Sequence, residues 1–562
     1  MDPADTYLGQ QLIAYIGNKR ALLPFLRGVL QRLPVDPGAA RFLDPFAGSG
    51  AVSRLARSMG FRVAANDWEP YSFVINSCHL ALRPSDLPAL FPGRGGIQAA
   101  MDELNRLPLP AEGQAYISRH YAPASTEGAD WRTERLFYTR ENALVIDSMR
   151  QRIEELFPAD LDTEGLPPGK AALLAPLLYE AATHTNTSGV FKACHKGFGG
   201  HGGDALRRIM GPVQLRAPAL FEGQEAEVAC MDAAAFLSSR PAEVCYLDPP
   251  YSIHQYGSNY FMLNTIARWD RPPVSGERSA DGRLREKAGI RPDWVRTRSA
   301  FCYRATAAAA MREVVHAADC RWLVVSYSDE GLVGLEEMCD LLSETGALEV
   351  QSRGYARYPG GRQSSRRATR NVELALVVRR GAPSRVSRAA RQAVADTRVA
   401  RLLSRSFHPS RVRRAFRIRG EAIVVDDGTL LPMEHLWRFR AEVSPPRFAS
   451  AGAARDFESA LAACAVRDAR EEIEVLVSLA SRARSDGECG RFLREMIRLL
   501  NRLGHPRYRV EFQEALDLLR GFGGRVAVPE SFLRSLEEVR SRVRRRLTAS
   551  PRGAGGLARV KA

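Results

Sequence analysis

The residues best suited to chemistry in this chain form the run Asp248-Pro249-Pro250-Tyr251. They follow the apolar run 244–247, which predicts a buried strand. Two consecutive prolines remove two backbone donors and stiffen the turn, so carbonyl acceptors point outward. A carboxylate beside such a carbonyl can accept both hydrogens of an exocyclic amino group, while the tyrosine ring stacks on a planar base. The run therefore favours recognition of an amine on a flat heterocycle, and its alternative is a purely structural turn.

A second candidate is the glycine turn that spans residues 44–50, with the sequence DPFAGSG. It lies between a predicted strand and the predicted amphipathic helix 51–60. Glycines let the backbone approach a ligand closely, and the helix N-terminus offers free N–H groups. A dinucleotide fingerprint would need a third glycine where this chain has Ser53, so the pattern departs from it. We expect a ligand-binding turn with these candidate contacts: Asp44, Phe46, Gly48 and Gly50.

Two further acids follow strand-like runs. Asp67 lies seventeen residues beyond Gly50, and an acid at about this place commonly binds a ribose diol. Asp232 lies sixteen residues before Asp248 and is placed to face an adenine ring bound across neighbouring strands. Both have a structural alternative, because an aspartate after a strand also caps the following helix.

These motifs need a parallel sheet to bring them together. Short apolar runs alternate with helical periods between residue 10 and about residue 79, which is typical of a parallel α/β sheet. In open α/β sheets, ligands bind at the carboxyl ends of the strands, where all four motifs would then lie. The expected strands cover residues 41–44, 61–67, 244–247, 322–327 and 372–378.

The pattern along the chain divides it into six regions. An α/β domain is expected in two halves, with a long insertion between them and a second excursion at about 252–318. After it we expect a basic linker with one or two short helices, then a mostly helical region that begins with a hairpin around Asp426-Asp427-Gly428, and finally a disordered tail. The boundaries are 1–79 and 227–380 for the two halves, 80–226 for the insertion, 381–420 for the basic linker, 421–548 for the helical accessory domain and 549–562 for the tail.

Composition and charge narrow the class of protein. The 562 residues are 45% hydrophobic and 26% charged, which is ordinary for a globular chain and excludes collagen or a disulfide miniprotein. The formal net charge of +16 favours a polyanionic partner such as nucleic acid. Arginine supplies most of it, because the chain has six lysines among 80 basic residues.

Other signals indicate a cytoplasmic protein without a structural metal. The nine cysteines include no Cys-x-x-Cys pair, and the N-terminus lacks a signal peptide. The most apolar stretch, 171–182, is too short to cross a bilayer, so no membrane partner is expected. His184, His195 and His201 lack the carboxylate or cysteine spacing that would complete a metal site.

Taken in order, the motifs resemble the Dam-like adenine-specific DNA methyltransferases, which depend on S-adenosylmethionine. The resemblance covers about residues 12–380 and rests on YIGNKRALLP from Tyr15, FLDPFAGSG from Phe42, AND from Ala65, the segment of Asp232, and YLDPPY from Tyr246. It implies an α/β fold with the Rossmann-like methyltransferase sheet. It also implies that the cofactor binds near 44–50, with its ribose at Asp67 and its adenine near Asp232. Tyr15 and Lys19 would line the methionine end and the target base, and Asp248, Pro249, Pro250 and Tyr251 would be the catalytic tetrad.

The same resemblance gives the regions their expected roles. Residues 1–79 would be the cofactor-binding half, 227–380 the catalytic half, and 80–226 the inserted target-recognition region. Within the insertion, amides, hydroxyls and basic side chains between flexible glycines suit phosphates and base edges, and a solvated loop is the alternative. The candidate DNA contacts are Asn186, Ser188, Lys192, His195 and Lys196.

The expected function is site-specific methylation of N6 of adenine in double-stranded DNA. The target base would leave the duplex, and its amine would attack the methyl group directly. The setting would be restriction–modification or epigenetic marking, with a restriction or defence protein as a candidate partner. Alternatives are N4 of cytosine, adenine in RNA, or a noncatalytic nucleic-acid-binding component of a larger complex. The C-terminal third departs from the family, and its role stays open.

Overall fold

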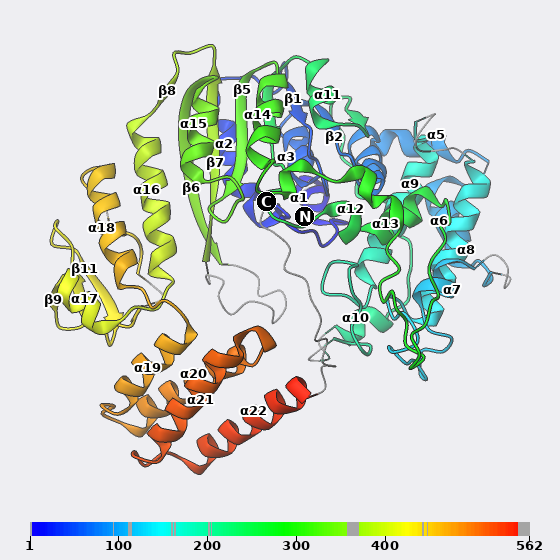
Figure 1. Cartoon of the computed structure of the whole chain (residues 1–562). Helices are drawn as coiled ribbons and strands as arrows, with labels where there is room; N and C mark the ends of the chain where they lie inside the picture. Colours follow the sequence, from blue (N-terminus) through cyan, green and yellow to red (C-terminus); the bar gives the residue numbers. More distant parts are fainter. Residues whose placement is uncertain are drawn as a thin grey trace. The chain divides into compact units, whose positions relative to one another are not determined.

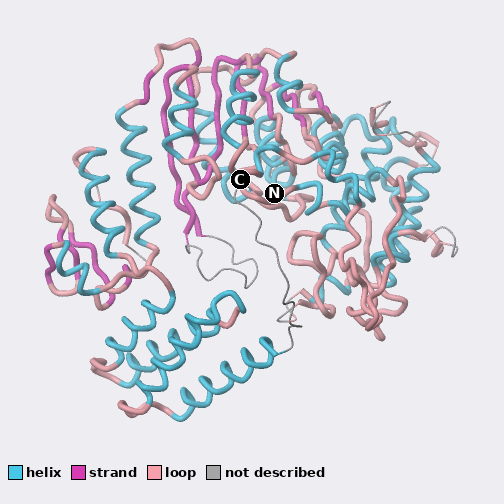
Figure 2. Tube along the Cα trace, viewed as in Figure 1, coloured by secondary structure: helices cyan, strands magenta, loops and turns pink. Residues whose placement is uncertain are grey.

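The computed structural model describes residues 3–93, 95–110, 115–158, 161, 165–200, 203, 205–356, 370–440, 443–446 and 448–548 (Figure 1). They form two compact units, the first with residues up to 355 and 372–390, the second with residues 356, 370, 371 and those from 391 onward. The first unit combines many helices with a large sheet, and the second is mostly helical (Figure 2). The expected tail, 549–562, lies outside the described residues.

The first unit is built on an eight-stranded sheet with the order β3-β2-β1-β4-β5-β7-β6-β8. β1 pairs in parallel with both β2 and β4, which continue in parallel to β3 and β5, whereas β7 runs antiparallel to β5. The strands are β1 (Arg41–Asp44), β2 (Arg62–Asn66), β3 (Glu227–Ala229), β4 (Ala242–Leu247), β5 (Cys320–Ser328), β6 (Gly346–Ala356), β7 (Arg370–Arg380) and β8 (Arg385–Val386).

The predicted α/β class is confirmed, and each of the five expected strands is present. β1 and β4 end in consecutive buried residues, as expected for central strands with both faces covered. β6 and β8 were not predicted. β6 carries Glu349 and Gln351 between its few apolar residues, so it lacks the continuous apolar run that identifies a central strand.

Helices cover both faces of this sheet (Figure 1). On one face, apolar residues of α2 (Leu23–Gln31) and α3 (Ala51–Ser58) form a cluster with alternate strand residues such as Phe42, Val244 and Val324. The other helices associated with the sheet are α1 (Pro3–Gly9), α11 (Ala233–Ser238), α14 (Ala307–Ala317) and α15 (Leu335–Ser343).

The insertion between β2 and β3 forms a helical layer beside the sheet. Its core is a separate apolar cluster to which α9 contributes most, and α9 contains the apolar stretch 171–182. The helices are α4 (Pro70–Asn76), α5 (Leu87–Leu90), α6 (Gly96–Asn105), α7 (Ile117–Tyr121), α8 (Arg140–Leu156), α9 (Pro168–Thr183) and α10 (Leu206–Met210).

A buried carboxylate joins two of these helices. Asp147 in α8 has no exposed surface. Its oxygens accept hydrogen bonds from the backbone N–H groups of Tyr116, Ile117 and Ser118, at 3.1, 2.7 and 2.9 Å. These are free donors at the start of α7, so Asp147 satisfies groups that the helix cannot.

The second insertion, between β4 and β5, contributes to the same layer. It begins with α12 (Tyr256–Asn259) and α13 (Phe261–Arg268), whose Phe261 and Leu263 lie in the apolar cluster of the first insertion. Two single helical turns, Pro292–Thr297 and Ala300–Cys302, precede α14.

The loop 271–291 of the second insertion is attached to the first insertion through its own backbone carbonyls. The hydroxyl of Tyr116 donates to the carbonyl of Pro272 at 2.5 Å, and that of Tyr121 donates to Gly289 at 2.9 Å. Nη2 of Arg135 donates to the carbonyls of Ser275 and Glu286, at 2.6 and 2.7 Å, and Nη1 donates to His120 at 3.2 Å. Side chains of the first insertion thus hold the loop through its backbone, in addition to contacts of loop side chains such as Arg271, whose Nη2 donates to Oε1 of Gln151 at 2.6 Å.

The second unit contains a small antiparallel sheet of order β12-β11-β10-β9. The predicted hairpin is confirmed, because Ala422 pairs with Pro432 and Val424 with Leu430 around the turn. The strands are β9 (Arg417–Arg419), β10 (Ala422–Val424), β11 (Leu430–Glu434) and β12 (Arg438–Phe439).

The segment 381–420, expected to be a basic linker with one or two short helices, is folded over residues 388–419. They form α16 (Arg388–Leu403), α17 (Pro409–Ala415) and β9. Val399, Phe407 and Val412 are fully buried in one cluster with Ile423 of β10. The segment is rich in arginine, and its few apolar residues form this buried cluster.

Five helices complete the second unit, as the helical periodicity of 456–547 predicted. Their apolar faces form a cluster that includes Leu476, Leu499 and Leu519. The helices are α18 (Ala451–Cys464), α19 (Ala469–Ala480), α20 (Asp486–Leu503), α21 (Arg509–Gly523) and α22 (Glu530–Thr548).

No helix in the described part of the chain has both the length and the apolar composition that crossing a bilayer requires.

Replacing Asp147 by asparagine tests the attachment of α7. Asparagine offers one acceptor oxygen and places an amide donor against backbone donors, so we expect the first unit to lose about 1–3 kcal/mol of stability. Calorimetry should show a lower midpoint of thermal unfolding. Asp102→Asn is the matched control, because Asp102 is an exposed residue of α6, and its midpoint should stay near the wild-type value. An unchanged midpoint in Asp147→Asn would contradict this role.

Candidate active site

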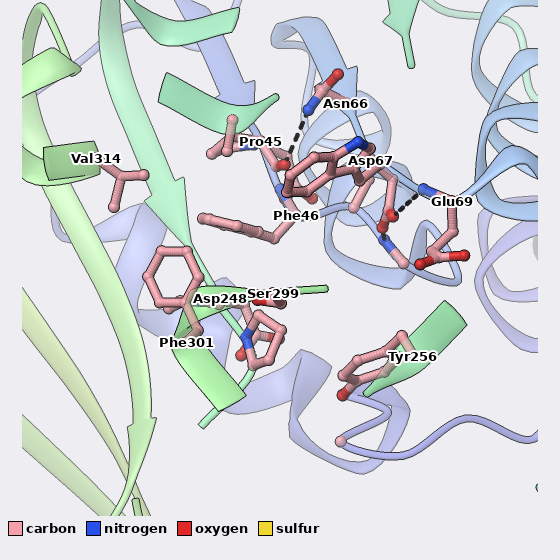
Figure 3. Close-up of a pocket in the computed structure, with 18 of the residues that line it drawn as sticks. Pro45, Phe46, Asn66, Asp67, Glu69, Asp248, Tyr256, Ser299, Phe301 and Val314 are labelled. Atoms are coloured by element: carbon pink, nitrogen blue, oxygen red, sulfur yellow. Dashed lines mark hydrogen bonds between the residues drawn. The ribbon is translucent and has the colours of Figure 1, made fainter. Parts of the chain in front are cut away.

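A cavity opens at the carboxyl edge of the central strands (Figure 3). Its walls come from segment 15–19, from the turns after β1, β2 and β4, from the start of α11, and from residues 297–301 of the second insertion. Gly50 does not line it but lies between the lining residues Ser49 and Ala51. The predicted site residues that meet in this cavity are Tyr15, Lys19, Asp44, Phe46, Gly48, Asp67, Asp232, Asp248, Pro249, Pro250 and Tyr251.

Asp44 ends β1 and is almost completely buried. Burial raises the pKa of its carboxyl to about 7, and the hydroxyl of Ser53 donates to Oδ2 at 2.6 Å. Ser53 stands where the dinucleotide fingerprint has its third glycine, so the departure from that fingerprint has a structural role. Gly50 has a φ of +78°, and a Cβ there would collide with Oδ1 of Asn76.

Gly48 is held from three directions. Its N–H donates to Oδ2 of Asp67 at 2.8 Å, and its carbonyl accepts from the hydroxyl of Ser72 at 2.7 Å. Its φ is +52°, and a Cβ would come within 2.8 Å of Cε1 of Tyr15. The ring of Tyr15 therefore packs directly on the glycine turn, which couples the N-terminal segment to the strand β1.

Asp67 lies at the end of β2, with both oxygens directed to backbone N–H groups. Besides Gly48, it accepts from the N–H of Glu69 at 2.9 Å (Figure 3). Burial raises the pKa of Asp67, although these hydrogen bonds oppose the effect. Each carboxylate oxygen has two acceptor positions, so Asp67 keeps capacity for hydroxyl donors from a ligand.

Asp232 has the helix-capping role that was the alternative for it. Its Oδ1 accepts from the N–H groups of Ala234 and Ala235, at 2.9 and 3.1 Å, at the start of α11. It also lines the cavity. Asn66 joins this wall to the β1 turn, because its amide nitrogen donates to the carbonyls of Pro45 and Met231 (Figure 3).

Asp248 follows β4, and its side chain is 16% exposed. Its Oδ1 lies 3.2 Å from Nζ of Lys19, and Nζ also contacts Oε1 of Glu373 at 2.5 Å. Burial raises the pKa of Asp248 to about 7; Lys19 opposes this shift and Glu373 adds to it. Burial alone would lower the pKa of Lys19, but the two carboxylates raise it well above its usual value.

Aromatic rings enclose the space beside Asp248. Tyr251 lies with its ring centroid 5.1 Å from Nζ of Lys19 and packs edge-on against Tyr327. Tyr256 and Tyr15 are 5.2 Å apart between centroids and form the wall on the side of segment 15–19. Such rings suit a flat heterocycle and a cationic group.

Sequence reasoning missed several residues of this site. Glu373 in β7 is fully buried and accepts from the hydroxyl of Ser326 at 2.8 Å, in addition to Lys19. Glu69 lines the cavity, and burial raises its pKa to about 7. Phe301 packs edge-on against Phe46, with 5.3 Å between ring centroids. A glutamate inside the apolar run of β7 was the one signal that pointed to Glu373.

None of the five expected DNA contacts lines the cavity. Asn186 has no exposed surface, and its amide donates to the carbonyls of Leu136 and Gly197, at 3.0 and 3.3 Å. Ser188, Lys192 and Lys196 are exposed, and His195 is partly exposed.

Among the described residues, no three or more His, Cys, Asp or Glu side chains are grouped in a way that could hold a metal ion.

The chain was compared with protein families and solved structures. The profile of the D12 class N6 adenine-specific DNA methyltransferases matches residues 15–283. No solved structure matches the chain.

Similar curated proteins are DNA modification enzymes by name. The type II methyltransferase M.NlaIII of Neisseria lactamica is 29% identical over 363 residues, which cover 63% of this chain and 94% of that protein. M.CviAII of Paramecium bursaria Chlorella virus 1 is 28% identical, over 62% of this chain and 92% of its own length. The modification methylase LlaI of Lactococcus lactis subsp. lactis is 27% identical over 65% of this chain, but over only 54% of its own length.

The resemblance expected from the motifs is confirmed by these matches. Through residues 15–283, this chain belongs to the D12 class N6 adenine-specific DNA methyltransferase family.

Proposed function

We propose that this chain transfers the methyl group of S-adenosylmethionine to N6 of adenine at a specific sequence in double-stranded DNA. The observation that carries the proposal is the setting of Asp248. This carboxylate is held on one oxygen by Lys19 and faces a cavity walled by tyrosines and by the glycine turn. Membership of the family supports the reaction and the base.

The cavity fits S-adenosylmethionine, which when bound supplies an electrophilic methyl group on a sulfonium. Asp67 retains acceptor capacity for ribose hydroxyls. Phe46 and Asp232 are placed for the adenine ring, and Gly48 brings its backbone to the cavity wall without a side chain. A lining rich in carboxylates favours a cationic ligand. The acids that line the cavity are Asp44, Asp67, Glu69, Asp232, Asp248 and Glu313.

Asp248 and Pro249 orient the attacking amine. Oδ2 of Asp248 and the carbonyl of Pro249 accept the two amine hydrogens, which directs the nitrogen lone pair at the methyl carbon. Tyr251 stacks on the target base and limits its rotation. With a pKa of about 7, Asp248 is also able to take the proton that the methylated amine releases.

The target adenine must leave the duplex to reach this buried carboxylate. The helical insertion 80–226 adjoins the catalytic sheet in one compact unit and supplies the proposed target-recognition region. Ser188, Lys192, His195 and Lys196 are its proposed DNA contacts. The names of the similar proteins support a role as the modification enzyme of a restriction–modification system, with a restriction enzyme as its functional partner.

The proposed reaction is tested with purified protein, mixed-sequence duplex DNA and isotopically labelled S-adenosylmethionine. Digestion to nucleosides and mass spectrometry should give labelled N6-methyladenine. Labelled N4-methylcytosine would overturn the base, and label found only with RNA would overturn the substrate.

Asp248→Ala should lower the single-turnover rate at least about 100-fold, because it removes a polar contact at the reacting nitrogen. Asp319→Ala is the matched control, since Asp319 is an exposed carboxylate at the opposite end of β5. It should keep the wild-type rate. Intact turnover in Asp248→Ala would rule out the proposed catalytic role.

The pH profile of the single-turnover rate should report the ionisation of Asp248. We expect the rate to rise with pH through about 7, because the ionised carboxylate is the better acceptor. Lys19→Gln removes the cation that lowers this pKa, so its profile should move to higher pH. Glu373→Gln removes the anion that raises it, so its profile should move to lower pH.

Ser326→Ala is the control for this pair, because it removes a hydrogen bond to Glu373 without changing charge. Its profile should stay near the wild-type position. Shifts of the same sign in Lys19→Gln and Glu373→Gln would contradict the electrostatic explanation.

Gly48→Ala should weaken S-adenosylmethionine binding by about tenfold or more, because a Cβ meets Tyr15 and the backbone conformation is strained. Isothermal titration calorimetry without DNA measures the affinity. Gly28→Ala is the control: Gly28 lies in α2, and a methyl group added there would meet no neighbouring atom within 4 Å. Equal affinity in both variants would place the cofactor elsewhere.

A further inference from the structure

The lysines of this chain are distributed unevenly. The sequence has only six, against a large excess of arginine. Lys19 and Lys170 are buried in ion pairs, the latter with Glu154 at 2.9 Å. The remaining described lysines, Lys192, Lys196 and Lys287, are all exposed and all lie in the two insertions. The arginine-rich composition of the whole chain does not explain why these exposed lysines all lie in the insertions.

Two of these lysines converge on one tryptophan. Nζ of Lys196 lies 4.4 Å from the ring centroid of Trp131, and Nζ of Lys287 lies 5.5 Å from it. The three residues come from separate loops, two in the first insertion and one in the second. We call Trp131, Lys196 and Lys287 the lysine–tryptophan cluster. The ring itself is partly exposed.

The positive charge of Lys196 and Lys287 is not neutralised by any carboxylate in the part of the chain that the structure describes. Within the described part of the chain, neither Lys196 nor Lys287 has a carboxylate within ion-pair distance, although Glu286 adjoins Lys287 in sequence. Arg132 also lies over the ring, but it is paired with Asp130 at 3.3 Å. Each ammonium is attracted to the ring face, while the two like charges repel each other.

The loop that carries Lys287 is held in place next to Trp131. The N–H of Leu284 donates to the carbonyl of Arg132 at 3.1 Å, and Arg135 binds the carbonyls of Ser275 and Glu286. The backbone that carries Lys287 is therefore held beside Trp131, where both ammonium groups lie near the ring.

We propose that the lysine–tryptophan cluster binds the phosphate backbone of duplex DNA, so that the second insertion shares DNA binding with the first. The inference rests on the proposed function, since it takes DNA as the substrate. Contacts with phosphates carry no sequence information. They can be made by two ammonium groups on separate loops, because each lysine acts as a compact positive charge. The tryptophan keeps both lysines extended toward the ligand and offers a flat surface to a sugar or an exposed base.

The test is the salt dependence of DNA affinity, measured by fluorescence anisotropy with a labelled duplex that the wild-type protein methylates. Each lost phosphate contact should reduce the slope of log Kd against log [KCl] by about 0.9, so Lys196→Gln/Lys287→Gln should reduce it by about 1.8. The same variant should bind about tenfold more weakly at about 0.1 M KCl. Lys196→Arg/Lys287→Arg keeps the charge and should keep the wild-type slope.

Arg106→Gln is the matched control for loss of a positive charge. Arg106 is 79% exposed in the same insertion but lies near Asp102, and its slope should equal that of the wild type. A wild-type slope in the double glutamine variant would overturn the inference while leaving methylation of DNA intact. If the wild-type protein transfers no methyl group to DNA, the proposed function itself fails. Unchanged S-adenosylmethionine affinity without DNA verifies that the double variant is folded.

Discussion

The buried lysine between two carboxylates is the interaction on which the rest of the site depends. Lys19 comes from the N-terminal segment, Asp248 from the end of β4 and Glu373 from β7. A buried charge without a partner is costly, so each of the three residues constrains the position of the other two. Because Lys19 is fixed in this way, Tyr15 four residues earlier is brought onto Gly48, where its ring shapes the glycine turn.

The strand order explains why residues so far apart in sequence share one cavity. β1 lies between β2 and β4, and all three run in parallel, so the residues after each strand meet at one edge. Both insertions leave the sheet from this same edge, one after β2 and one after β4. The helical layer that they build therefore adjoins the cavity.

The site residues that could be predicted from sequence are polar residues placed directly after apolar strands. Asp67 and Asp248 directly follow β2 and β4, Asp44 is the last residue of β1, and Asp232 lies shortly after β3. The cavity contains all four. Glu373 could not be assigned in the same way, because its role depends on β7 entering the sheet antiparallel beside β5, a pairing that local sequence does not encode.

The burial of Asn186 in the first insertion and of apolar residues in the segment 388–419 could not be predicted from the sequence either. Asn186 lies in a glycine-rich basic segment typical of a solvated loop, yet its amide nitrogen donates hydrogen bonds to two backbone carbonyls. The segment 388–419 is rich in arginine, and its few apolar residues still form a core with β10. In both cases tertiary contacts determine which residues are buried, whereas the local composition of the sequence does not.

The manner in which loop 271–291 is attached has a consequence for how such an enzyme can diverge. Tyr116, Tyr121 and Arg135 hold the loop by its carbonyl oxygens, which every amino acid possesses. Exposed side chains of the loop such as Arg278 and Arg283 can therefore be exchanged without loosening these hydrogen bonds. Other loop positions are constrained, because Arg271 binds Gln151, Leu284 is buried and a Cβ at Gly289 would meet Arg135. Surface chemistry can thus change at the exposed positions while the backbone attachment of the loop is kept.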